Sequence, residues 1–156
     1  METKMIANEM LQVAEIELIY KSKVKASERP VITTSKDAYQ ILLTSWNDNK
    51  IELVEEFKIL LLNRSNKVLA MYQLSTGGIS GTIADTRLVF TAALKANAVS
   101  ILLAHNHPSG SLKPSRQDEL LTQKFRAAGE MLDIKILDHL IVCKEGYYSF
   151  ADEGLL

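Results

Sequence analysis

The side chains best suited to chemistry lie close together in residues 104–118. His105 and His107 are two positions apart, and side chains with that spacing on extended backbone project to the same side. Both imidazoles can therefore face one point while Asn106 faces away. Asp118 follows near the start of a predicted helix and can turn back toward them. Two imidazoles and a carboxylate form the three-ligand set of a catalytic zinc site, which leaves a fourth position for a water molecule that ionises near neutral pH.

Ser115 and Asp118 also allow a purely structural interpretation. A serine followed three residues later by an acidic residue is close to a capping box, in which the two side chains satisfy the first N–H groups of a helix. Capping explains neither the paired histidines nor the loop between them and the helix. An acidic residue is favoured at a helix N-terminus whether or not it binds a metal. The cap and the metal site are therefore compatible, and we favour the metal site.

The size and charge of the chain predict one catalytic domain. With 156 residues, 47% of them hydrophobic, the chain can bury a substantial core but is short for two domains. A formal net charge of -1 and a pI near 6.3 provide no basic field that would attract nucleic acid. Nucleic acid is therefore a partner that the overall charge does not support.

Cysteine usage and hydropathy predict a cytoplasmic protein with no membrane partner. Cys143 is the only cysteine, so no intrachain disulfide can form, and within the apolar residues 140–143 it is expected to be a small core residue of a strand. The longest apolar runs, at residues 59–62 and 99–104, are far too short to span a bilayer. The N-terminus also lacks the long apolar segment of a secretion signal.

Hydrophobic periodicity divides the chain into an arm and a domain. Residues 5–15 have helical spacing, and residues 16–25 alternate imperfectly, like a strand with one solvated face, until residues 27–30 interrupt the pattern. The sequence leaves open whether this N-terminal part, residues 1–29, is a detached helix and strand or adds an edge strand to the domain. Residues 30–156 form the predicted domain.

Helices alternate with strands through the predicted domain. The predicted helices cover residues 36–46, 86–96 and 115–131, with Ser35 and Asp85 as N-caps of the first two, and the predicted strands cover residues 57–62, 68–74, 98–104, 134–142 and 147–150. Residues 75–82, with three glycines, and residues 105–114 are predicted loops near the site. The fold class is therefore α/β, a single domain with a mixed β-sheet flanked by helices.

The spacing His-x-His-x7-Ser-x2-Asp resembles the motif of the JAMM (MPN+) metalloproteases. The similarity is closest to the bacterial RadC-like proteins, through His-Asn-His-Pro-Ser-Gly at 105–110, Pro-Ser-x-x-Asp at 114–118, Asp-His-Leu-Ile-Val at 138–142 and Gly-Thr at 81–82. It extends over roughly residues 30–156. The resemblance implies a JAMM/MPN-like, cytidine-deaminase-like architecture and a Zn²⁺ cofactor.

The resemblance also assigns roles to individual residues. In this family two histidines and an aspartate bind zinc, which makes His105, His107 and Asp118 the ligands, and a serine, here Ser115, hydrogen-bonds at the metal site. Ser115 is further expected to donate to the oxyanion that develops on a substrate. An upstream glutamate activates the zinc-bound water, as a general base that passes the proton to the leaving amine.

Two adjacent residues, Glu55 and Glu56, are candidates for that base. They precede a buried strand, and neighbours on a strand point to opposite faces, so only one of them can reach the metal. We choose Glu55 because it stands two residues before Phe57, as in RadC-like sequences. His139, in the predicted strand near the site, is expected to be structural or to support a ligand, since three protein ligands already complete an open zinc site.

The resemblance implies a zinc-dependent metallohydrolase, a peptidase or isopeptidase-like enzyme with a peptide or protein substrate. Two other functions compete with it. A DNA-associated protein of the RadC type, acting in DNA repair, is implied by the family name. Four basic residues on or beside the helix that leaves the site would contact phosphates in that case: Lys113, Arg116, Lys124 and Arg126. Similar charges also form an ordinary solvated helix face, which we favour. A non-catalytic JAMM-like scaffold is the third function, and the complete ligand set argues against it.

Overall fold

The computed structural model describes residues 14, 17, 19–77 and 84–156. Most of the predicted N-terminal helix and the glycines of the predicted 75–82 loop beyond Gly77 lie outside these residues. The helices of the described part are η1 (Ala26–Glu28), α2 (Ser35–Ser45), α3 (Thr86–Lys95) and α4 (Arg116–Met131). Its strands are β1 (Glu56–Leu62), β2 (Val68–Thr76), β3 (Ser100–Asn106), β4 (Lys135–Cys143) and β5 (Gly146–Ser149).

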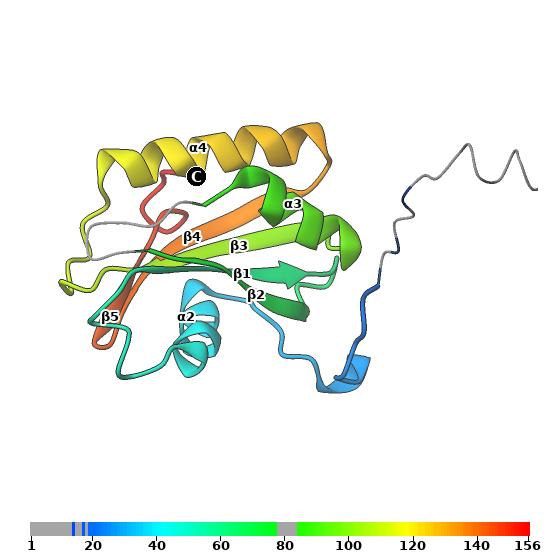
Figure 1. The fold of residues 1–156 in the computed structure, drawn as a ribbon, viewed down its shortest axis with the longest axis horizontal. Coiled ribbons are helices and arrows are strands. Elements are labelled where there is room, and N and C mark those ends of the chain that lie inside the picture. The colour runs from blue at the N-terminus through cyan, green and yellow to red at the C-terminus, as the bar shows by residue number, and fades with distance from the viewer. Residues whose placement is uncertain (1–13, 15–16, 18, 78–83) are drawn as a thin grey trace, which may run out of the picture.

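The five strands form one mixed sheet in the order β2-β1-β3-β4-β5. β3 and β4 are parallel and are connected through α4, whereas the other neighbouring strands are antiparallel. Figure 1 shows α3 and α4 on one face of the sheet and α2 on the other. The predicted α/β domain with a mixed sheet flanked by helices is therefore confirmed.

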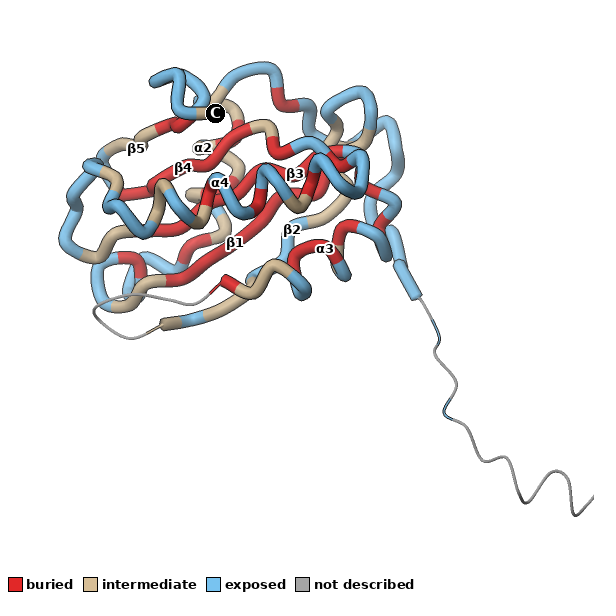
Figure 2. The backbone as a smooth tube through the Cα atoms, turned by 90° about the horizontal axis from the view of Figure 1, so that it is seen from above, coloured by how far each residue is buried: buried red, intermediate tan, exposed pale blue. Residues whose placement is uncertain are grey.

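The sheet separates two hydrophobic cores, and the strands contribute to both. In β1 every residue is buried, and Phe57 and Ile59 pack with α3 and α4 while Leu60 and Leu62 pack with α2. Figure 2 shows the same burial along β1, β3 and β4 in the middle of the molecule. Cys143, at the end of β4, is buried as predicted. A strand buried on both faces reads as a continuous apolar run, because each face has its own helical cover.

Helix caps explain where the three long helices begin. Asp85 caps α3 and Ser115 caps α4 through their side-chain oxygens, as predicted. The predicted N-cap of α2 is wrong by one residue. Thr34, and not Ser35, accepts from the N–H of Asp37, and the Asp37 carboxylate accepts from the N–H of Thr34, which completes a capping box. Ser35 instead lies in the first turn, where its hydroxyl contacts Tyr147 and Asp152.

Two further boundaries differ from the prediction. β3 begins later and ends later than predicted, so His105 and Asn106 belong to the strand and not to the loop, since their backbone stays paired with β1 and β4. Residues 19–25 contain no strand, and the Tyr20 hydroxyl donates to the carbonyl oxygen of Leu69, which ties this segment to β2 by a side chain.

No helix of the described residues is long and apolar enough to cross a membrane.

Gly129 brings α4 close to the start of β4. Its carbonyl oxygen accepts from the N–H of Ile134. A Cβ atom on Gly129 would overlap the main-chain oxygen of Ile134. The close approach sets how α4, which carries Asp118, lies over β4, which carries His139.

We predict that Gly129→Ala lowers the free energy of unfolding, although alanine has a helix propensity about 1 kcal/mol more favourable than glycine. The overlap with backbone cannot be relieved by a side-chain rotation. Urea unfolding of the parent and the variant would measure the effect. Ala127→Gly, at an exposed position of the same helix, is the control and is expected to cost about 1 kcal/mol from propensity alone. A Gly129→Ala protein more stable than the parent would contradict this packing.

Candidate metal centre

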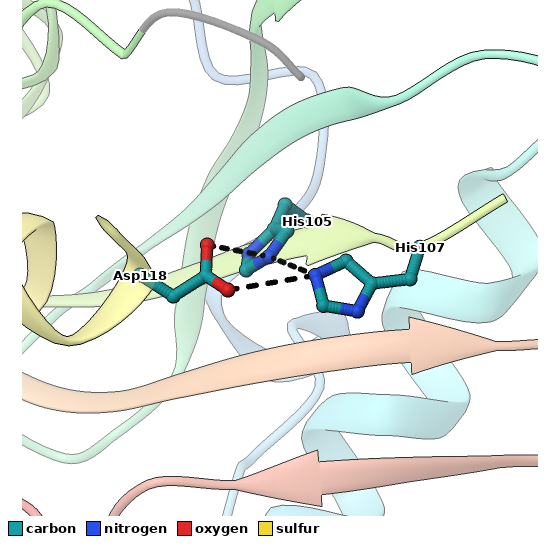
Figure 3. Close-up of side chains that lie close together, drawn as sticks. All are labelled: His105, His107 and Asp118. Carbon is teal, nitrogen blue, oxygen red and sulfur yellow. Dashed lines mark hydrogen bonds and ion pairs between the residues drawn. The ribbon is translucent and has the colours of Figure 1, made fainter. Parts of the chain in front are cut away.

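Three side chains converge where β3 ends and α4 begins. His105 lies near the end of β3, His107 directly follows the strand, and Asp118 lies in the first turn of α4, as Figure 3 shows. The two histidine Nε2 atoms are 3.0 Å apart. The Asp118 carboxylate oxygens lie 3.2 Å from Nε2 of His105 and 3.6 Å from Nε2 of His107. These residues form a group that could hold a metal ion.

The distances fit a tetrahedral ion. Ligand atoms about 2.0 Å from a tetrahedral zinc lie about 3.3 Å from one another, close to the separations observed here. Nδ1 of His107 lies 2.8 Å from the carbonyl oxygen of Ser111, which can only accept, so in the neutral ring Nδ1 carries the proton and Nε2 a lone pair. The lone pair on Nε2 of His107 therefore faces a second imidazole nitrogen and a carboxylate, and a cation bound between these groups would stabilise the arrangement.

Ser115 holds the Asp118 carboxylate in place. The main-chain N–H and the hydroxyl of Ser115 both donate to Oδ2 of Asp118 at 2.7 Å, and the Ser115 oxygen accepts from the N–H of Asp118. The capping box that the sequence suggests is therefore present, together with the group of His105, His107 and Asp118. In this arrangement the proton of the Ser115 hydroxyl is directed at Asp118, and the residue orients a candidate ligand.

Electrostatics favour an ionised Asp118. Burial raises the pKa of its carboxyl group, but the hydrogen bonds that His105 and His107 donate from Nε2 when their rings are protonated outweigh burial and leave the pKa well below the usual range. The hydrogen bond to Asp118 raises the pKa of His107 against the effect of burial, and the charge of Glu55 adds to the increase. Asp118 therefore offers a full negative charge to a cation.

Glu55 and Glu56 lie in different environments. The Glu56 carboxylate is buried, accepts from Nε2 of Gln73 and pairs with Nζ of Lys58 at 3.7 Å. Lys58 in turn donates to the carbonyl oxygen of Ser45 in α2, so this pair occupies the α2 face of the sheet, opposite the three-residue group. Glu55 directly precedes β1, is half-buried, and is close enough for its charge to raise the pKa of His107.

Asn106 has a role that its position in the motif does not reveal. Its side chain faces away from the histidines, as expected, and is completely buried. Its Oδ1 accepts from the N–H of Glu56, and its Nδ2 donates to the carbonyl oxygens of Ile51 and Val54. Asn106 thus anchors residues 51–56, which carry Glu55, to β3. Only the alternation of faces along the strand hints at this role, because the partners are about fifty positions away in the sequence.

The structure brings His139 to the group and keeps Asp138 away from it. His139 is completely buried, and its Nε2 lies 2.8 Å from Nδ1 of His105. Burial, reinforced by the neighbouring His105, lowers the pKa of His139 well below its ordinary value. The Asp138 carboxylate accepts instead from Ser149 and from the N–H of Ala151, which ties β4 to the C-terminal turn. The expectation that His139 is structural or supports a ligand agrees with this placement.

A mixed sheet with helices on both faces, two histidines at the end of a strand and an aspartate in the first turn of the next helix define a JAB-type domain. The sequence model of the family described as RadC-like JAB domain matches residues 32–155, and the chain belongs to this family. A UPF0758 protein of Flavobacterium johnsoniae is 52% identical over 124 residues, covering 80% of this chain and 53% of the relative. One from Porphyromonas gingivalis is 46% identical over 129 residues, covering 82% and 56%.

A third relative, the UPF0758 protein YfjY of Escherichia coli K12, is 46% identical over 102 residues, which are 65% of this chain and 64% of the relative. The chain spans about half the length of the two relatives from Flavobacterium johnsoniae and Porphyromonas gingivalis. The similarity therefore concerns the JAB domain and not the remaining part of those proteins.

We predict about one divalent metal ion per chain, because the group offers one set of three ligands. His107→Ala and Asp118→Ala should each lose the ion, since two ligands do not complete a site. Elemental analysis of protein purified without chelators would measure the content. Asp48→Ala, an exposed carboxylate outside the group, is the control and should keep the ion. Unchanged metal content in both ligand variants would contradict the assignment.

Proposed function

We propose that this chain is a zinc-dependent metallohydrolase that cleaves an amide bond of a peptide or protein, as a peptidase or isopeptidase. The observation that carries the proposal is the convergence of the His105 and His107 Nε2 atoms and the Asp118 carboxylate at separations of 3.0 to 3.6 Å. Membership of the RadC-like JAB domain family supports it.

The ligand set favours zinc over other divalent ions. Two imidazoles and one carboxylate match three-ligand catalytic zinc sites, whereas magnesium and calcium prefer oxygen ligands alone. A zinc ion held by His105, His107 and Asp118 would polarise a substrate carbonyl and acidify a water molecule.

The residues around the ion would divide the remaining work. Glu55, on the segment anchored by Asn106, takes a proton from the attacking water and delivers it to the leaving amine. Ser115 orients Asp118 through its hydroxyl, and its assignment as a donor to the oxyanion requires that hydroxyl to turn away from Asp118. Glu56 is excluded from the reaction in this proposal, because Lys58 and Gln73 engage its carboxylate on the other face of the sheet.

We predict that Glu55→Gln keeps the zinc and lowers the rate of hydrolysis by about 10²- to 10⁴-fold, the usual contribution of a general base. Glutamine preserves the size of the side chain but cannot accept the proton. A screen of peptide and isopeptide substrates, followed by kcat/KM on the best substrate and by elemental analysis, would measure both quantities.

Glu56→Gln is the matched control. It should hydrolyse at close to the parent rate and lose stability, because the buried Lys58 ammonium would no longer face a carboxylate. An inactive, zinc-loaded Glu56→Gln beside a fully active Glu55→Gln would exchange the two roles. If both variants hydrolyse at the parent rate, neither glutamate is the general base. If the parent protein binds zinc but hydrolyses nothing in the screen, the non-catalytic scaffold is favoured.

A DNA-associated role has weaker support than hydrolysis. Two of the four basic residues considered for phosphate contacts are paired with carboxylates along α4, Arg116 with Glu119 at 3.0 Å and Arg126 with Glu130 at 3.4 Å. Both arginines are exposed, as expected of a solvated helix face. Pairing of this kind reduces the charge available to a nucleic acid.

We predict weak binding to duplex DNA. Neutralisation of phosphates by basic residues makes log K fall linearly with log salt concentration, with a slope proportional to the number of contacts. Fluorescence anisotropy across a salt series would measure that slope for the parent and for a variant with Lys113, Arg116, Lys124 and Arg126 changed to glutamine. Tight binding whose salt dependence disappears in the variant would establish the DNA-associated role in place of our expectation.

A further inference from the structure

His139 is completely buried directly behind His105, a candidate metal ligand. Its ring stacks on Phe150 with centroids 4.9 Å apart and lies 5.6 Å from the ring centroid of Phe57. Both nitrogens of His139 have close polar partners. Nε2 lies 2.8 Å from Nδ1 of His105, and Nδ1 lies 2.6 Å from the hydroxyl oxygen of Thr122 in α4. All four of these neighbours are buried, so these are the contacts through which the ring meets its hydrogen-bonding needs.

The contacts have a preferred direction. The Thr122 hydroxyl lies 2.7 Å from the carbonyl oxygen of Asp118 and donates its single proton to it. Thr122 therefore accepts from Nδ1–H of His139. A neutral imidazole that donates through Nδ1 accepts through Nε2, so His139 receives the proton of Nδ1 of His105. The remaining nitrogen of His105, Nε2, then presents its lone pair to His107 and Asp118.

We propose that Thr122 and His139 form a buried positioning relay that holds His105 as its Nδ1–H tautomer, with the Nε2 lone pair facing the metal position before an ion binds. The inference deepens the proposed function and rests on the role of His105 as a ligand. In the opposite direction the Thr122 hydroxyl would donate to His139, and His105 would carry its proton on Nε2, where it blocks the metal. The relay excludes that arrangement.

The relay also connects two of the ligands. It starts at the carbonyl oxygen of Asp118, whose side chain is a candidate ligand, and it ends at His105. The first turn of α4 and the end of β3 are thereby joined by hydrogen bonds in addition to packing. Partners that support a ligand in this way typically contribute 10- to 100-fold to metal affinity.

The first test observes the tautomer directly in the full chain without metal. Long-range ¹H–¹⁵N correlation spectra of the imidazoles distinguish a ring protonated at Nδ1 from one protonated at Nε2. We expect His105 and His139 both to carry the proton on Nδ1 in the zinc-free protein. A His105 ring protonated on Nε2 would overturn the proposal.

The second test removes the relay with little change of shape. Thr122→Val replaces the hydroxyl by a methyl group and leaves His139 without its acceptor, whereas Thr122→Ser keeps the hydroxyl. We expect competition with a chromophoric chelator to show about tenfold weaker zinc binding for Thr122→Val, the lower end of the usual range for supporting partners. Thr122→Ser should bind within about twofold of the parent. The spectra of Thr122→Val should also show a changed tautomer mixture at His105.

A second pair of variants acts on His139 itself. His139→Gln offers one acceptor and one donor group to the same partners, and His139→Leu offers neither. We expect the leucine variant to bind zinc about 10- to 100-fold more weakly and the glutamine variant to recover part of that loss. Equal affinities for the parent, Thr122→Val and His139→Leu would reduce His139 to core packing and overturn the relay.

These measurements need no substrate, so failure of the relay and failure of the proposed function can be told apart. If the parent hydrolyses amides through Glu55 while Thr122→Val binds zinc as the parent does, only the relay is wrong. If the tautomers and affinities follow our expectation while no amide is hydrolysed, the relay stands and the proposed reaction is wrong.

Discussion

The structure depends on holding three electron-rich groups closer together than they would stay on their own. The Nε2 atoms of His105 and His107 and an ionised carboxylate at Asp118 repel one another wherever their lone pairs face a common point. Folding overcomes this repulsion with hydrogen bonds behind each group: the Ser111 carbonyl behind His107, the Ser115 cap behind Asp118 and His139 behind His105. In our proposal, such an arrangement is organised for a cation before one arrives.

The opposite face of the sheet serves the same group. His105, Asn106 and His107 are consecutive, so the alternation of β3 directs the amide of Asn106 toward the segment that carries Glu55. On that face Glu56 and Lys58 form a buried ion pair, and the Lys58 ammonium lies 4.3 Å from the centre of the Trp46 ring. A buried charge needs such partners, and these contacts keep Glu56 on the α2 side at the start of β1.

The sequence predicts those features that depend on neighbours in the chain. The caps at Asp85 and Ser115 and the shared side of His105 and His107 follow from spacings of a few residues. Features that depend on pairing across strands escape it. In β4 the even-numbered apolar residues look like one face, yet Ile136 packs with α4 and Leu140 packs with α2. A register shift between Ile101 and Leu102 leaves Leu137 without a partner in β3 and turns the face, which directs His139 toward His105. The partners of Asn106 are equally invisible to local patterns.

The anchorage of Asn106 has a dynamic consequence. The segment that precedes β1 is tied to β3 through a fully buried side chain, and that side chain stands between the two histidines in the chain. Glu55 and the histidines are therefore joined through buried hydrogen bonds, which oppose a displacement of one relative to the others. Residues 108–114 are mostly exposed and lie outside helices and strands, but the carbonyl oxygen of Ser111 in this loop contacts Nδ1 of His107. Motion of the exposed part of this loop would change how easily a large molecule approaches, whereas motion at Ser111 would also turn the ring of His107, so access and geometry are coupled through one carbonyl oxygen.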